Sequence, residues 1–213
     1  MKNKRTYYHL ILDKSGSMTS CIEQTVDGVN QQIRRIKEVA ERFPEQELIT
    51  SLTLFNNHIT PVWTRIMPER LREITFSDYR PSGSTALLDA IGSTTDDIQR
   101  FAGSELDADE ASVVVVIITD GHENSSVKFT HDNVASLIRE LELTGKWTFS
   151  YIGATLDAVD IAADFNIKPI NAMHFNLNES FMMYHKLNNS IDSYLNDKQS
   201  GKISSEFLKN EEA

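Results

Sequence analysis

The sequence predicts an α/β fold, doubly wound around a mostly parallel central sheet, with one antiparallel edge strand and helices on both faces. Two observations carry this prediction. Strand-like and helix-like stretches alternate along nearly the whole chain, without a linker rich in proline or glycine between them. The stretch 112–119 reads Ser-Val-Val-Val-Val-Ile-Ile-Thr and lacks polar alternation, which is typical of a central parallel strand covered on both sides.

In the first half of the chain, we expect a strand over Tyr7–Leu12 and a long helix over Met18–Phe43. The apolar residues of 18–43 recur every three or four positions, which places them on one helix face. An alternating stretch, 48–55, is followed by two asparagines and a second run over His58–Thr64. This pattern is typical of a hairpin, and it predicts the antiparallel edge strand.

In the second half, apolar spacing predicts a helix over Leu87–Phe101, followed by a solvated acidic loop, 105–110. Beyond the strand 112–119, the same reasoning predicts three helices and two strands: helix His131–Leu143, strand Trp147–Ile152, helix Asp157–Phe165, strand Ala172–Phe175 and helix Phe181–Leu195. We expect residues 1–197 to form a single domain and 198–213 to be a polar, frayed C-terminal tail.

The composition is that of an ordinary globular protein, and it argues against several classes of function. The 213 residues include 31 Asp and Glu against 21 Lys and Arg, a formal net charge of −10. This balance disfavours a broad nucleic-acid surface, which needs clustered cations. The apolar runs are too short for a membrane span or a secretory signal. We therefore expect a cytoplasmic protein whose single cysteine, Cys21, is a small buried apolar residue.

Two aspartates stand at the carboxyl ends of predicted strands. Asp13 opens the loop Asp13–Ser17, which reads Asp-Lys-Ser-Gly-Ser, and Asp120 follows the apolar strand. Because the site of such folds lies beyond the carboxyl ends of the central strands, these carboxylates are expected to converge. A third loop, 81–85, ends in a threonine at a helix start. Together the three loops offer the donors of a hard-cation site: Asp13, Ser15, Ser17, Thr85 and Asp120.

This constellation resembles the metal-ion-dependent adhesion site of the von Willebrand factor type A family. That signature is Asp-x-Ser-x-Ser after the first strand, a Thr in a loop that follows a Gly, and an Asp, usually followed by Gly, after the central apolar strand. All five positions are filled here. The resemblance covers the order of elements from Tyr7 to Phe175, and it implies a Rossmann-like type A domain, in a stand-alone cytoplasmic protein of bacterial type.

The resemblance also implies a bound Mg²⁺, with Mn²⁺ or Ca²⁺ as possible substitutes. Ser15, Ser17 and Thr85 would touch the ion directly or nearly so, whereas Asp13 and Asp120 would often act through water. Neutral hydroxyls do little to quench a doubly charged ion, which keeps an open position for an Asp or Glu of a partner protein. The rim that meets this partner would consist of Gly16, Ser84 and His122.

The leading hypothesis is therefore a non-enzymatic, metal-dependent protein-interaction module without a nucleic-acid or membrane partner. Type A domains of this kind accompany ATPase chaperones, metal-resistance systems or kinase and phosphatase pairs, and the sequence does not choose among them. The alternative is a Mg²⁺-dependent hydrolase or phosphotransferase with Asp13 as nucleophile, although α/β phosphatases carry a second acid where this chain has Ser15. In a simpler reading, the hydroxyls are helix caps and the aspartates turn residues.

Overall fold

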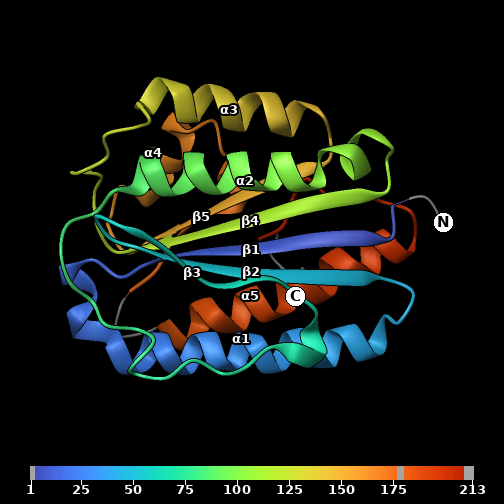
Figure 1. Cartoon of the computed structure of the whole chain (residues 1–213), viewed down its shortest axis with the longest axis horizontal. Helices are drawn as coiled ribbons and strands as arrows, with labels where there is room; N and C mark the ends of the chain where they lie inside the picture. The colour runs from blue at the N-terminus through green and yellow to red at the C-terminus, as the bar shows by residue number, and fades with distance from the viewer. Residues whose placement is uncertain (1–2, 177–179, 209–213) are drawn as a thin grey trace.

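The computed structural model describes residues 3–176 and 180–208, and the strands within these ranges form one six-stranded sheet (Figure 1). The strands lie in the order β3-β2-β1-β4-β5-β6, and every neighbouring pair is parallel except β2 and β3. The predicted sheet with one antiparallel edge strand is confirmed. The strand bounds are β1 Arg5–Asp13, β2 Glu47–Phe55, β3 Ile59–Ile66, β4 Ala111–Thr119, β5 Trp147–Gly153 and β6 Ala172–His174.

Helices cover both faces of the sheet (Figure 1). One face carries α1 (Ile22–Arg42) and α5 (Ser180–Gln199), which lie side by side, and the other carries α2 (Leu87–Asp107), α3 (His131–Leu143) and α4 (Ala158–Asp164). Short 3-10 turns are η1 (Gly16–Cys21), η2 (Pro68–Arg70) and η3 (Pro169–Asn171). All nine residues of β4 are buried, as predicted for a strand covered on both sides. None of the helices in the described ranges is long and apolar enough to cross a lipid bilayer.

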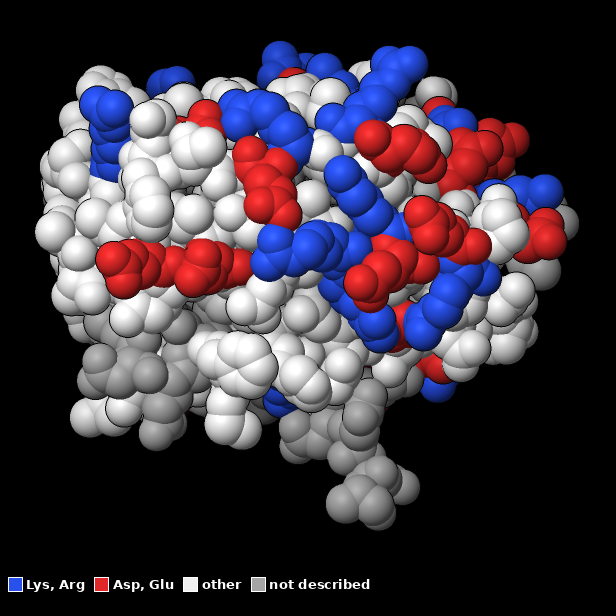
Figure 2. Space-filling view, turned by 90° about the horizontal axis from the view of Figure 1, so that it is seen from below, with Lys and Arg blue, Asp and Glu red and all other residues white. Residues whose placement is uncertain are grey.

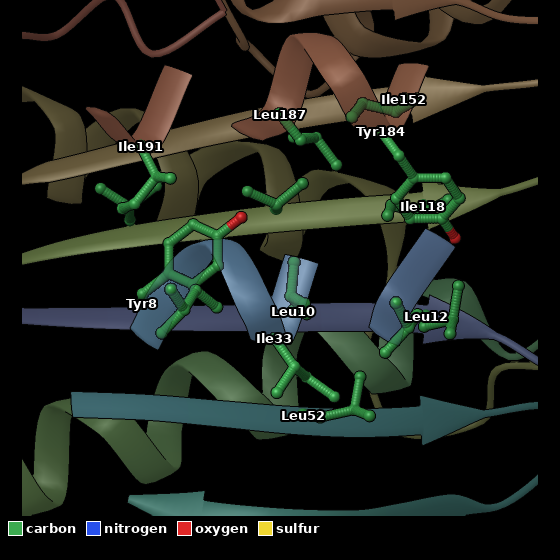
Figure 3. Close-up of a cluster of buried hydrophobic side chains, with 14 of the residues drawn as sticks. Tyr8, Leu10, Leu12, Ile33, Leu52, Ile118, Ile152, Tyr184, Leu187 and Ile191 are labelled. Atoms are coloured by element: carbon green, nitrogen blue, oxygen red, sulfur yellow. The ribbon is translucent and has the colours of Figure 1, made fainter. Parts of the chain in front are cut away.

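The core layer between the sheet and helices α1 and α5 is built from alternate strand residues and one face of each helix (Figure 3). Leu10 and Leu12 of β1 face this layer, because side chains two positions apart share a strand face. They meet Ile33 of α1 and Leu187 of α5, which are almost fully buried. Each such side chain contributes about 1.5–3 kcal/mol when it is fully buried.

The chain reverses its direction across the sheet between β1 and β4. From β1, α1 leads to β2 on one side, whereas α2 later returns the chain to β4 on the other side. Such a switch point leaves a crevice at the carboxyl ends of the two strands. Leu12 pairs with Ile118 across β1 and β4. Asp13 directly follows Leu12, and Asp120 comes two residues after Ile118, so both aspartates lie at the same edge of the sheet.

The first predicted helix begins differently in the structure. Residues 16–21 form the 3-10 turn η1, and the α-helix begins only at Ile22. Ser15 has an extended backbone with φ −64° and ψ 169°. Its carbonyl accepts from Met18 N at 3.2 Å, and the Thr19 hydroxyl donates to Gly16 O at 2.7 Å. This tight local winding keeps the Ser-Gly-Ser stretch outside the regular helix.

The acidic stretch 105–110 is only partly the solvated loop that the sequence predicts. Helix α2 continues to Asp107, and the Glu105 carboxylate accepts hydrogen bonds from Arg5 and, at 2.7 Å, from the Tyr7 hydroxyl. Both partners belong to β1, about a hundred residues away in the chain. These tertiary contacts give Glu105 a structural role that local spacing does not reveal.

The tail that is predicted to fray after Asp197 is packed in part: residues 199–202, 205 and 206 are exposed, whereas Lys198, Ser204, Phe207 and Leu208 are buried. Phe207 and Leu208 are buried in the core layer beneath α1 and α5. The Phe207 ring lies 5.9 Å from that of Tyr8, and its backbone N donates to Asn171 Oδ1 at 2.7 Å. One short apolar pair anchors this otherwise polar segment, which composition alone does not show. Residues 209–213 lie outside the described residues.

The packing of Phe207 can be tested by stability. Phe207→Ala should lower the free energy of unfolding by about 3–5 kcal/mol, because it removes a buried ring and leaves a cavity. Urea denaturation followed by circular dichroism measures the change. Glu206→Ala, at an exposed neighbour, is the control and should have little effect on stability. If the two variants were equally stable, Phe207 would not pack in the core, and the tail would be frayed as the sequence predicts.

Lys198 is a second buried residue of this segment, and its contribution to stability depends on pH. Its buried ammonium donates to Arg5 O, Thr6 Oγ1 and Ser112 Oγ at 2.6, 2.6 and 2.8 Å, and burial lowers its pKa to about 7. The unfolded value is about 10.4. Between these pH values the unfolded chain binds the extra proton, so this group makes stability rise by about 1.4 kcal/mol per pH unit.

Lys198→Met should therefore flatten the increase in stability between pH 7 and 9. Urea denaturation at both pH values measures it against the wild type. Lys202→Met removes an exposed lysine and should preserve the wild-type pH dependence. If Lys198→Met and the wild type gained stability equally over this range, Lys198 would not titrate as described.

Candidate metal centre

Three loops meet at the edge of the sheet where β1 and β4 end. They are Asp13–Ser17 after β1, the loop before α2 that ends at Thr85, and the loop that begins at Asp120 after β4. Backbone hydrogen bonds join the first two loops, because Gly16 N donates to Gly83 O at 3.0 Å. The five predicted ligands thus come from three chain segments held at one edge.

Asp13 is the buried carboxylate of this edge. Its side chain is shielded from solvent, and both of its oxygens accept hydrogen bonds at 2.6 Å, Oδ1 from Ser15 N and Oδ2 from the Thr119 hydroxyl. Burial raises the pKa of Asp13; the hydrogen bonds from Thr119 and Ser15 lower it in part, and nearby Asp120 raises it further. The hydrogen bonds therefore hold the carboxylate in one orientation, although burial makes its ionised form less favourable.

Two serine hydroxyls connect the interior of the site to its mouth. Ser15 Oγ lies 3.0 Å from Ser17 Oγ, and Ser17 Oγ donates to Asp120 Oδ1 at 2.7 Å. Ser15 is buried, Asp120 is half-buried and Ser17 is exposed. Burial raises the pKa of Asp120, while the hydrogen bond from Ser17 lowers it. The row of oxygens leads from the core to solvent.

Gly121 lies close to three of the oxygens at this edge. A β-carbon on Gly121 would lie 3.3 Å from Thr85 Oγ1, 3.5 Å from Ser17 Oγ and 3.9 Å from Asp13 Oδ2. Oxygens from two loops therefore lie around one point beside Gly121 of the third loop, which we call the Gly121 cradle. Hydroxyl and carboxylate oxygens of this kind are the ligands that hard divalent cations prefer.

The donor set fits a hard divalent cation. No group of three or more His, Cys, Asp or Glu side chains suited to a metal gathers within the described ranges, so a cation site here depends on neutral oxygens as well as carboxylates. Burial raises the pKa of both Asp13 and Asp120. A nearby divalent cation favours the ionised form of a carboxylate, and so would offset this cost.

Thr85 is held in place by the loop that follows β4. Thr85 N donates to Asn124 Oδ1 at 2.9 Å, and Asn124 N donates back to Thr85 O at 3.0 Å. Glu123 accepts from Leu88 N at 2.9 Å, which caps an orphan donor of α2 with a favourable negative charge. In return, Asp89 of α2 accepts from three backbone N–H groups of residues 127–129. The two loops are therefore locked to one another.

The segment between β3 and α2 supports the end of β1. It runs beside α1 and then rises past the strand ends to α2 (Figure 1). The buried Tyr79 hydroxyl donates to Asp13 O at 2.7 Å. The Asn30 side chain of α1 donates to Ile74 O at 3.0 Å and accepts from Ile74 N at 2.8 Å. A stretch with no clear sequence pattern thus fixes the backbone of the buried ligand.

The three predicted rim residues occupy different positions. Gly16 is exposed, Ser84 is half-buried, and the His122 side chain is 63% exposed with its Nε2 3.9 Å from Asp157 Oδ2. Gly16 and His122 are accessible to a partner, whereas Ser84 offers less surface.

Sequence reasoning did not identify the residues that hold the ligands. Thr119 and Gly121 flank Asp120, and Asn124 lies two residues after His122. Closeness in sequence to a predicted site residue is therefore the signal that could have identified these three. Tyr79 lies 66 residues from Asp13, and no local pattern could have connected them.

No protein-family model and no curated protein sequence matches the chain, but solved structures share its fold. A von Willebrand factor type A protein from Catenulispora acidiphila has a TM-score of 0.57 at 13% identity, over 88% of this chain and 43% of that one. Manganese-loaded TRAP from Plasmodium vivax has a TM-score of 0.54 at 15% identity, over 84% and 72% of the two chains.

A third structure is proximal thread matrix protein 1 from the mussel byssus, with a zinc-occupied metal-ion-dependent adhesion site. Its TM-score is 0.56 at 13% identity, over 89% of this chain and 46% of that one. This chain spans less than half the length of the Catenulispora acidiphila protein and of the mussel protein. At such low identities the likeness concerns the fold: the chain has the fold of von Willebrand factor type A domains.

Proposed function

We propose that the chain is a metal-dependent protein-interaction module that captures an Asp or Glu carboxylate of a partner protein through a divalent cation. The observation that carries this proposal is the Gly121 cradle, where the Thr85 oxygen of one loop and the Ser17 and Asp13 oxygens of another lie around one point on the third loop. A cradle of hydroxyls beside two carboxylates suits Mg²⁺, which we propose as the physiological ion.

The five candidate ligands would contribute to ion binding in two different ways. Ser15, Ser17 and Thr85 would supply neutral oxygens, and Asp13 and Asp120 would supply negative charge. When bound, the cation provides an electrophilic centre to which a carboxylate can attach. The hydrogen bonds of Asp13 to Thr119 and Ser15 orient its carboxylate before any ion arrives, which reduces the reorganisation that binding requires.

The solved structures of the same fold support a divalent metal, because one is described as manganese-loaded and another as zinc-occupied. We propose a non-catalytic role, in which the ion binds and does not activate water. A cytoplasmic location, and a partner from an ATPase chaperone or a kinase and phosphatase system, are part of the same proposal.

Gly121→Ala tests the cradle itself. The added methyl group would occupy the point that the oxygens surround, so Mg²⁺ affinity should fall by about tenfold or more while the fold is kept. Isothermal titration calorimetry measures the affinity, and thermal unfolding monitors the fold. Gly103→Ala is the matched control, because a β-carbon there meets nothing within 4 Å. Unchanged Mg²⁺ binding in Gly121→Ala would argue against a metal at this point.

Asp13→Asn and Thr85→Ala test the ligands. Each should weaken Mg²⁺ binding by about 10- to 100-fold, because each removes a charge or an oxygen from the donor set. Asp96→Asn removes an exposed carboxylate of α2 and should bind as the wild type does. Phosphatase and ATPase assays on the same proteins should detect no turnover. Phosphatase or ATPase turnover that is present in the wild type and vanishes in Asp13→Asn would contradict the interaction module and support the hydrolase.

A further inference from the structure

The two outer strands of the sheet differ in how well their edges are protected. On β3, Pro61 has no N–H to offer, and Arg65 has a φ of 55° in a strand with an irregular register. Prolines and irregularities of this kind keep an edge strand from pairing with another chain. The other outer strand, β6, reads Ala172-Met173-His174 and has neither feature, so only its shortness limits such pairing. Within the described ranges β6 pairs with β5 alone.

The backbone of β6 presents hydrogen-bonding groups on its open side. Phe175 N donates to Gly153 O of β5. Successive residues of a strand point their N–H and C=O groups to opposite sides, so Met173 also points toward β5. Ala172 and His174 therefore point theirs away from β5. These groups can pair with a strand that lies beside β6.

Exposed apolar side chains gather around this edge. Half of the large apolar residues that are exposed within the described ranges belong to the segment 156–182, which contains β6: Leu156, Val159, Ile170, Phe181 and Met182. Val159 of α4 is 40% exposed and Ile170 of η3 is 38% exposed. Both α4 and η3 contact β6. Concentrations of exposed apolar surface mark sites of interaction.

Charged side chains become fewer toward the β6 side of the molecule. Figure 2 views the face that carries α1 and α5, and acidic and basic side chains crowd its upper part but are few in its lower part. Helix α1 has more charged residues than α5. Because α1 connects β1 with β2, whereas Tyr194 of α5 donates to Ser112 of β4, α5 lies nearer to β6. Depletion of charge is typical of the core of an interface.

The charges that do flank β6 are complementary between two copies of the chain. Lys168 precedes η3 at the amino end of β6, and Asp160 lies in the first turn of α4, which begins beyond the carboxyl end of β5. Both are exposed, and neither forms an ion pair within the described ranges. When two β6 strands run antiparallel, the amino end of each lies beside the carboxyl end of the other. Lys168 of each copy then faces Asp160 of the other.

We propose that two copies of this chain form a two-fold symmetric dimer through antiparallel pairing of their β6 strands, which joins the two sheets into one. Ala172 of each copy pairs with His174 of the other, and the exposed apolar side chains of α4 and η3 pack beside the paired strands. Only the protected β3 edges then remain open. The pairing does not involve the metal. It places the two candidate metal centres at opposite ends of the dimer, because the paired strands run in opposite directions.

Sedimentation equilibrium in EDTA, at protein concentrations from about 5 to 500 µM, tests the dimer. The wild type should approach twice the monomer mass as the concentration rises. Val159→Lys and His174→Pro should each weaken association by about tenfold or more, because the first places a charge in the apolar contact and the second removes an outward N–H. Met67→Lys is the matched control: Met67 is 38% exposed, follows β3 at the other edge, and should leave the dimer intact.

Charge reversal tests the direction of pairing. Asp160→Lys or Lys168→Asp alone should weaken the dimer, because each places like charges opposite one another, whereas the double variant should regain it. Lys168→Asp also removes a positive charge that acts on Glu142, so thermal unfolding is measured for every variant. A wild type that stays monomeric over the whole range, or a dimer that Val159→Lys and His174→Pro leave intact, would overturn the proposal. A double variant without recovery would overturn the antiparallel arrangement.

Discussion

The candidate site depends on a buried carboxylate at the point where the sheet changes direction. Asp13 closes β1 and is completely shielded from water, so its charge is costly unless nearby groups compensate. Thr119 and Ser15 donate to its two oxygens, and Tyr79 donates to its carbonyl. The donors to this one residue therefore come from β4, from its own loop and from the segment before α2.

Reciprocal hydrogen bonds join the loops of the site to one another. Thr85 and Asn124 exchange two hydrogen bonds, and Asp89 accepts three from the loop that Asp120 begins. Glu123, in the same loop, accepts a hydrogen bond from Leu88 N at the start of α2. Rigid placement matters for a cation site, because a set of hydroxyl ligands binds well only when few of them must reorganise on binding.

Burial makes the two carboxylates of the site costly to ionise in the absence of a cation. At the site, burial raises the pKa of the two carboxylates, and a cation would relieve that cost. We therefore expect the metal to supply most of the affinity for a partner carboxylate.

Periodicity alone determined most of the fold. The apolar run of β4, the helix-spaced residues of α1 and the paired asparagines before β3 each predict their element, because buried faces impose a period on the chain. The order of three short motifs also predicted the five candidate metal ligands. What tertiary structure decided was everything that joins distant positions: the Tyr79 contact to Asp13, the space at Gly121, and the burial of Phe207. These depend on packing between segments, which leaves no period in the sequence.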